Sequence, residues 1–206
     1  SLFLYAGFGL ERFRSDSFPV RMPAAEFLAG CLRILCGART LPAHAVPGEP
    51  AIYFANHSSH LDFAIIWAAL PGHVRAQVRP VAGRDYWEGG QLRGWLAKSV
   101  FNAVLIERQR VTVANNPLEP MLAALDAGQA LIVFPEGTRS PDGTVQPFKA
   151  VLYHLARARP AIPLMPVFLD NLNRILPKGD FLPVPLLAGV HAGPPIRLDE
   201  GETREA

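Results

Sequence analysis

The segment Asn56-His57-Ser58-Ser59-His60-Leu61-Asp62 contains the residues best suited to proton transfer. His57 and Asp62 are five residues apart, whereas side chains on a regular helix meet at spacings of three or four. If His57 lies in a turn and Asp62 in the first turn of the following helix, the imidazole can reach back to the carboxylate. A carboxylate in that position fixes the tautomer of the imidazole and stabilises the imidazolium. The pair is therefore predicted to act as a general base that activates a hydroxyl, with no covalent nucleophile.

Two other interpretations of this segment stay open. Ser59 and Asp62 match the S-x-x-D capping box, which explains both residues by local structure alone. His57, His60 and Asp62 could instead hold a metal ion in a hydrolase. Their spacing, H-x-x-H-x-D, differs from the H-x-H-x-D of metallo-hydrolases, and no cysteine motif or later histidine motif supports it.

Two further segments carry groups that bind anions. Residues 134–140 (FPEGTRS) run from an apolar strand directly into a Pro/Gly turn that bears Arg139. Backbone amides in such turns, together with a guanidinium, form anion sites. The structural alternative is a tight loop capped by Thr138. Residues 104–108 (VLIER) place a second guanidinium, Arg108, at the end of another strand, which alone is a weak indication.

Short apolar runs alternate with helical patterns along most of the chain. Strands are expected at 51–55, 80–82, 103–106, 130–134, 164–169 and 187–192, and helices at 59–70, 91–100, 116–127 and 149–158. This order predicts an α/β fold with a mostly parallel central sheet flanked by helices. Functional sites in such sheets lie at the carboxyl ends of the strands. The segments described above follow three of these ends.

The first 40 residues differ from the rest and are predicted to form an N-terminal amphipathic helical segment, with the main α/β domain at 41–206. Residues 2–8 form an apolar patch, and Pro23 opens a helical pattern that Gly37 ends. Its apolar face is predicted to consist of Phe27, Leu28, Cys31, Leu32 and Leu35. This helix either packs against the core or lies in a membrane interface.

Composition narrows the function classes. Hydrophobic residues make up 50% of the 206 residues and charged residues 18%, which excludes a disordered chain and fits one domain. No apolar stretch of about 18 residues exists, so no membrane span is predicted. Arginine dominates the basic residues without forming a dense run, which favours a phosphorylated small molecule or an anionic membrane over nucleic acid. Cys31 and Cys36 form no CxxC pair, as expected of a reduced, cytosolic protein.

Taken in order, these motifs resemble those of a known family. They resemble the four motifs of the glycerolipid acyltransferases, and the matching segments are NHSSHLD, VLIER, FPEGTRS and an apolar segment with Pro166-Val167. This family includes 1-acyl-glycerol-3-phosphate acyltransferases and related lysophospholipid acyltransferases. The resemblance covers residues 50–170. The first and third motifs are specific in combination, whereas the second and fourth are loose.

The resemblance implies roles for individual residues. His57 is implied as the catalytic base, Asp62 as its charge partner, and Pro166 as a residue on the acyl-donor side. The implied substrate-binding residues are Asn56, Ser59, Arg108, Glu136, Gly137, Thr138 and Arg139. The chain departs from the family pattern at Asn102 and Leu105 in the second motif, and at residues 148–151, where Phe-Lys-Ala-Val replaces Phe-Lys-x-Gly. These departures bear on the acceptor head group.

The expected activity is transfer of a fatty acyl group from acyl-CoA or acyl carrier protein to the free hydroxyl of 1-acyl-glycerol 3-phosphate, giving phosphatidate. No metal and no redox cofactor are implied. The alternatives are another lysolipid acceptor, the metal-dependent hydrolase, and a membrane-associated binding protein. The chain is expected to lie peripherally on the cytoplasmic face of a membrane through residues 1–36, with Arg12, Arg14, Arg21 and Arg33 meeting anionic head groups.

Overall fold

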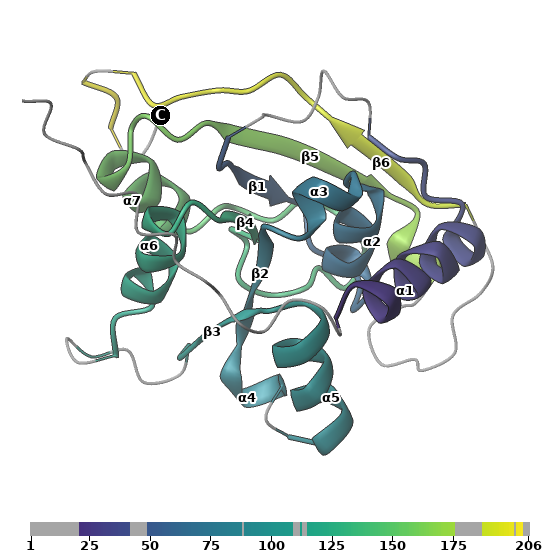
Figure 1. Ribbon diagram of the computed structural model, residues 1–206. Helices are drawn as coiled ribbons and strands as arrows, with labels where there is room; N and C mark the ends of the chain where they lie inside the picture. Colours follow the sequence, from purple (N-terminus) through teal and green to yellow (C-terminus); the bar gives the residue numbers. More distant parts are fainter. Residues whose placement is uncertain are drawn as a thin grey trace, which may run out of the picture.

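The computed structural model describes residues 21–41, 49–87, 89–108, 112, 115–175, 187–199 and 201–203. These residues form a six-stranded sheet in the order β3-β2-β4-β1-β5-β6 (Figure 1). The strands are β1 Ile52–Ala55, β2 Val78–Gly83, β3 Val104–Ile106, β4 Ala130–Val133, β5 Leu164–Asp170 and β6 Gly189–Ala192. All neighbouring pairs are parallel except β5 and β6, which are antiparallel.

Both faces of the sheet are covered, which explains why its two central strands, β1 and β4, are apolar at every position. In β1, Tyr53 and Ala55 belong to one hydrophobic core, whereas Ile52 and Phe54 belong to a second core on the opposite face. Side chains alternate between the two faces of a strand, so a strand between two helical layers needs apolar residues throughout. The buried run Ala130–Val133 follows the same rule.

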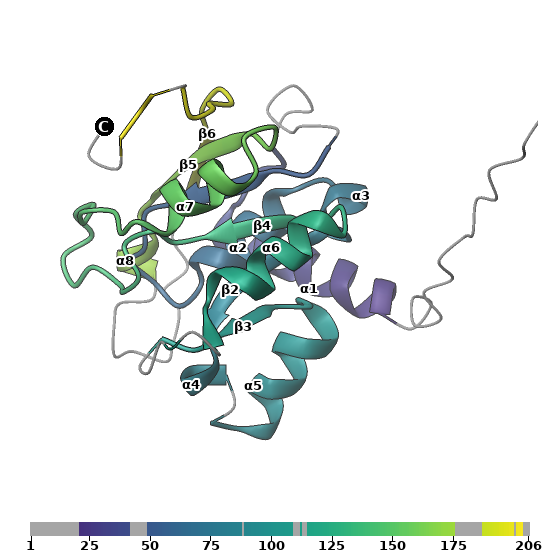
Figure 2. The ribbon, with the colours of Figure 1, turned by 90° about the vertical axis from the view of Figure 1, so that its left-hand side faces the viewer.

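Helices form a layer on each face of this sheet (Figures 1 and 2). Helices α1 (Arg21–Cys36) and α2 (Asp62–Ala69) contribute to the first core, and α6 (Leu118–Asp126) and α7 (Val151–Ala158) to the second. The shorter elements are α3 Gly72–Arg75, α4 Arg84–Trp87, α5 Gln91–Trp95, the π-helix η2 Leu96–Val100 and α8 Leu172–Ile175. The predicted α/β fold, with a mostly parallel sheet flanked by helices, is confirmed.

Some predicted elements have different bounds. The helix expected at 59–70 begins only at Asp62, and the preceding residues form a loop. The helix expected at 91–100 changes at Leu96 from α5 into η2. The short helices α3, α4 and α8 were not predicted.

Helix α1 packs on α2, but the predicted apolar face is only partly correct. The buried side chains belong to Ala29, Leu32 and Cys36, whereas the predicted Phe27 and Leu35 are 76% and 60% exposed. The stripe that meets the core is therefore rotated from the predicted one, and it leaves apolar side chains in solvent. The apolar patch at 2–8, Arg12 and Arg14 lie outside the described residues, as does the Arg21 side chain. The boundary at residue 40 stays a prediction.

Arg33 does not face outward as expected. Its Nε donates to the Ala68 carbonyl oxygen (2.7 Å) and its Nη2 to the Leu70 carbonyl oxygen (3.1 Å) at the end of α2. Carbonyls in the last turn of a helix lack partners within the helix, and a cation there also interacts favourably with the helix dipole. Burial, followed by the nearby charge of Arg75, lowers the pKa of Arg33. Arg33 therefore fastens α1 to α2.

No helix within the described part of the chain is long and apolar enough to cross a bilayer.

Candidate active site

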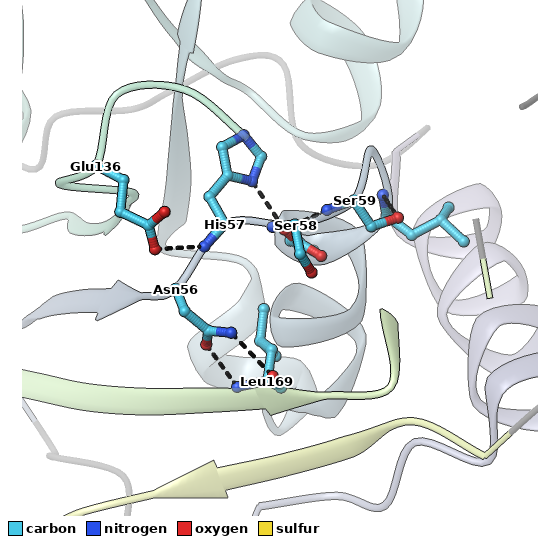
Figure 3. Close-up of polar contacts among 8 residues, drawn as sticks. Asn56, His57, Ser58, Ser59, Glu136 and Leu169 are labelled. Carbon is cyan, nitrogen blue, oxygen red and sulfur yellow. Dashed lines mark hydrogen bonds and ion pairs between the residues drawn. The ribbon is translucent and has the colours of Figure 1, made fainter. Parts of the chain in front are cut away.

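The predicted contact between His57 and Asp62 is present. His57 lies in the loop after β1, and Asp62 is the fully buried first residue of α2. The imidazole Nδ1 lies 2.8 Å from Asp62 Oδ2 (Figure 3). The same oxygen accepts hydrogen bonds from the backbone N–H groups of Ser58 (2.6 Å) and Ser59 (2.8 Å). The contact that the general-base interpretation needs is present, and the same oxygen makes one bond of the predicted capping box, that to the Ser59 N–H. The N-cap of α2 is Leu61, which has no side-chain cap.

This geometry determines which imidazole nitrogen can act as a base. An ionised carboxylate only accepts hydrogen bonds, so Nδ1 carries the proton and Nε2 carries the lone pair. The His57 side chain is 21% exposed and lines the main cavity. Its ring stacks on Phe134, with ring centroids 4.3 Å apart and planes inclined by 20°. The Phe134 ring thus supports the face of the His57 imidazole, and the Asp62 carboxylate holds its Nδ1 atom.

The loop from Phe134 to Ser140 also holds the backbone of His57. Glu136 Oε1 accepts a hydrogen bond from the His57 N–H (2.9 Å), and the Ser140 N–H donates to the His57 carbonyl oxygen (2.7 Å). Glu136 is 2% exposed and is not among the residues that line the cavity. Its position supports a role in placing His57. The resemblance had implied that Glu136 binds substrate, which its absence from the cavity lining does not favour.

Asn56 and Ser59 also bind protein atoms. The Asn56 amide donates to the Leu169 carbonyl oxygen (2.9 Å) and accepts from the Leu169 N–H (2.8 Å), which links the residue after β1 to β5 (Figure 3). Ser59 is fully buried, and its Oγ accepts from the Leu61 N–H (3.2 Å). Neither residue lines the cavity, so both support the loop that carries His57.

The remaining predicted residues come together around one cavity of about 540 Å³. Arg108, at the end of β3, and Gly137, Thr138 and Arg139, after β4, line it together with His57. The carboxyl ends of parallel strands thus supply the polar groups, as predicted. The apolar part of the wall includes Phe63, Trp87, Phe101, Ile106, Met121 and Val133.

The cations in this cavity have different surroundings. Arg108 forms an ion pair with Asp85, in which Nη2 donates to both carboxylate oxygens at 3.0 Å. Gly83 makes room for this pair, since an added Cβ would collide with the Arg108 guanidinium. The Arg139 Nη1 atom is buried and has no hydrogen-bond partner among the described residues. A buried guanidinium nitrogen without a partner suits an anionic ligand.

Sequence reasoning missed two residues of this cavity. Asp85 belongs to no motif, and only the sheet order places it opposite Arg108. Lys149 was noted only as part of a departure from the family pattern, yet it lines the cavity. A lysine soon after an anion-binding turn was the available signal.

The metal site predicted as an alternative lacks a suitable arrangement of ligands. Across the described residues, no group of three or more His, Cys, Asp or Glu side chains is placed to hold a metal ion. His60 lines the cavity, whereas Asp62 Oδ2 is turned toward two backbone N–H groups.

Known proteins share this fold and sequence. Residues 37–170 match the family described as Acyltransferase. The 1-acyl-sn-glycerol-3-phosphate acyltransferase alpha of Ovis aries is 33% identical over 131 residues, 62% of this chain and 42% of that protein. The 1-acyl-sn-glycerol-3-phosphate acyltransferase of Limnanthes alba is 32% identical over 152 residues, 73% of this chain and 51% of that protein. The chain thus spans about half the length of the curated relatives it matches.

A solved structure supports the fold independently. The crystal structure of the 1-acyl-sn-glycerophosphate (LPA) acyltransferase PlsC from Thermotoga maritima superimposes with a TM-score of 0.68 at 23% identity, covering 85% of this chain and 68% of that one. The family match covers more than half of the chain and includes the loops that meet at His57. The chain therefore belongs to the glycerolipid acyltransferase family.

Proposed function

We propose that this chain transfers a fatty acyl group from a thioester to the free hydroxyl of 1-acyl-glycerol 3-phosphate, giving phosphatidate. The observation that carries the proposal is the His57–Asp62 hydrogen bond, formed at the wall of a cavity that also contains Arg108 and Arg139. The names of the matching relatives from Ovis aries and Limnanthes alba support the same reaction.

The geometry suits general-base catalysis. His57 Nε2 takes the proton of the acceptor hydroxyl while the hydroxyl oxygen forms a bond to the thioester carbonyl carbon. The carbon–sulfur bond then breaks, and the imidazolium returns the proton to the departing thiolate. Asp62 stabilises the imidazolium between these steps. Proton transfer by a placed base contributes about 10²–10⁴ in rate.

The cations give the acceptor its orientation. Arg139, with its buried free nitrogen, and Arg108 bind the phosphate of the acceptor and so hold its hydroxyl near His57. The apolar wall that includes Phe63, Trp87 and Phe101 accommodates aliphatic chain. The thioester donor is acyl-CoA or acyl carrier protein.

The proposal includes a peripheral position on the cytoplasmic face of a membrane. Acceptor and product are both lipids, so the enzyme must meet a lipid surface. Helix α1 exposes Phe27, Ile34 (84% exposed) and Leu35 to solvent while its other face is buried. An amphipathic helix with exposed large apolar side chains is suited to the interface of a bilayer.

The test is an acyl-transfer assay with purified protein, labelled acyl-CoA or acyl-loaded carrier protein, and a panel of lysolipids. The expected result is labelled phosphatidate formed in preference to every other product. Labelling of a different lysolipid alone would correct the acceptor. Absence of transfer to any acceptor, from either donor, would contradict the proposed activity.

A further inference from the structure

Lys149 lies in the cavity, and no role has been assigned to it. Its backbone N–H donates to the Pro135 carbonyl oxygen (2.9 Å), which fixes it against the loop that carries Arg139. The preceding Phe148 packs edge-on against Phe54, with ring centroids 6.0 Å apart. Two contacts therefore anchor the backbone on the N-terminal side of the Lys149 α carbon.

The side chain of Lys149 follows a path that Gly137 leaves open. A Cβ on Gly137 would lie 2.6 Å from Lys149 Nζ and 3.0 Å from its Cε. Gly137 also has a φ of +74°, which disfavours any other residue. The aliphatic stem of Lys149 thus crosses the turn, and the residue lines the same cavity as His57 and Arg139.

The charged groups that line the cavity fall into two sets, those paired with a carboxylate and those without one. The other titratable groups that line it are His57, His60, Asp85, Glu107, Arg108 and Arg139. Both carboxylates gather at Arg108, since Asp85 pairs with its guanidinium and Glu107 accepts from its backbone N–H (2.9 Å). By contrast, Lys149 and Arg139, which follow β4 in the chain, have no carboxylate partner within the described residues. The excess positive charge therefore lies beside the turn at Gly137.

Lys149 and Arg139, which have no carboxylate partner among the residues that the structure describes, favour a head group with more than one negative charge. A phosphate monoester carries a charge of about −1.5 to −2 at pH 7 because its second pKa is about 6. A phosphodiester carries only one negative charge. We propose that Lys149 is a specificity-determining residue that selects an acceptor with a phosphate monoester over one with a phosphodiester. This inference rests on the proposed function and adds a reason for the choice of head group.

The experiment compares the wild-type protein with Lys149→Met and Lys149→Arg. The acceptors are 1-acyl-glycerol 3-phosphate and a lysophosphodiester, 1-acyl-glycerophosphoglycerol. Lys149→Met is expected to lower kcat/KM for the monoester about tenfold, mainly by raising KM, because a charge-assisted contact is lost. The diester should be affected much less, and Lys149→Arg should restore most of the monoester activity. Lys98→Met removes an exposed lysine that does not line the cavity and serves as the matched control.

The pH dependence separates a charge contact from a structural effect. For the monoester, the ratio of wild-type to Lys149→Met kcat/KM should shrink as the pH falls below about 6, where the phosphate takes up its second proton. Groups that titrate alike in both proteins cancel in this ratio.

The possible failures are distinguishable. If the wild-type protein does not use 1-acyl-glycerol 3-phosphate, the proposed function is wrong. If it does, and Lys149→Met keeps the wild-type kcat/KM, reduces both acceptors equally or gives a ratio that does not change with pH, the role of Lys149 is wrong. Melting temperatures check folding, and Lys149→Gln carries the same test if Lys149→Met does not fold.

Discussion

One buried oxygen, Asp62 Oδ2, joins the structure of the His57 loop to its chemistry. It accepts hydrogen bonds from the imidazole and from two backbone N–H groups. The loop therefore cannot take its shape without placing the carboxylate against Nδ1 of His57. This shared use explains how a spacing of five residues, unfavourable on a helix, brings the two side chains together.

Substitution of Asp62 separates the two roles. Asp62→Asn keeps an acceptor oxygen for the backbone but removes the charge that stabilises the imidazolium. We expect kcat for acyl transfer to fall by about 10² or more, with a small loss of stability. Asp62→Ala should lose activity to a similar degree and also about 1–3 kcal/mol of stability for each N–H left without a partner. Kinetic assays and urea denaturation measure both effects. Equal stability of the two variants would contradict the role of Asp62 in holding the backbone N–H groups of Ser58 and Ser59.

Glu136 offers a second test at the residue scale. Its Oε1 holds the backbone N–H of His57, and its side chain is outside the cavity. Glu136→Gln retains an acceptor oxygen, so we expect it to keep most of the wild-type kcat, whereas Glu136→Ala should lose at least tenfold with little change in KM. In Glu136→Ala the His57 N–H loses its acceptor, which should lower the free energy of unfolding by about 1–3 kcal/mol. Urea denaturation measures this loss. A Gln variant as inactive as the Ala variant would show that the charge itself is required.

The sequence predicts the chemical pair but not the orientation of its neighbours. A polar residue within a motif indicates that a polar group is needed, and it does not indicate whether that group faces substrate or backbone. Asn56 and Glu136 bind backbone atoms for this reason. Asp85 comes from another strand end, and its pairing with Arg108 depends on the order of strands in the sheet.

At the scale of elements, the attachment of α1 to α2 relies on polar contacts as well as apolar packing. Arg33 and Arg75 both donate to the carbonyl oxygens of Ala68 and Leu70. Nη2 of Arg75 also donates to both carboxylate oxygens of Glu26 in α1. These contacts join α1 to the C-terminal end of α2. This join also places α1 so that its apolar remainder faces solvent.

The contacts of Arg33 predict its effect on stability. Arg33→Ala is expected to lower the free energy of unfolding by about 0.5–1.5 kcal/mol, because two helix-terminal carbonyls lose one of their two charged donors and keep Arg75. Acyl transfer per folded molecule should stay unchanged. Urea denaturation measures the loss, and Arg39→Ala, at an exposed position after α1, is the control. Unchanged stability together with weaker binding to anionic vesicles would instead support the original expectation that Arg33 meets head groups.

The regular elements are those the sequence predicts best. Strands buried on both faces appear as continuous apolar runs, as in Ala130–Val133. The helices α3, α4 and α8 have four residues each, which is one turn and too short for a periodic pattern. The sequence also does not predict that β6 runs antiparallel to β5, because the side-chain pattern of a strand is the same in either direction. The apolar positions of α1 exceed one face, so periodicity did not identify the buried stripe.

At the scale of the whole molecule, we propose that the exposed apolar face of α1 contacts a lipid surface. The triple variant Phe27→Ser, Ile34→Ser, Leu35→Ser should bind anionic vesicles more weakly while keeping its fold, because all three side chains are exposed. Sedimentation with vesicles measures binding, and the control is Val145→Ser, an exposed apolar residue outside α1. Unchanged sedimentation of the triple variant would show that α1 does not contact the bilayer.

The most direct test of the central claim is acyl transfer to 1-acyl-glycerol 3-phosphate by His57→Ala. His57 packs at the cavity wall with 21% of its side chain exposed, so its removal should leave the melting temperature close to that of the wild type. The control is His154→Ala, at an exposed position on α7 that does not line the cavity. Loss of the base predicts a decrease in kcat of about 10² or more for His57→Ala and none for His154→Ala. Near-normal turnover by folded His57→Ala protein would contradict the account.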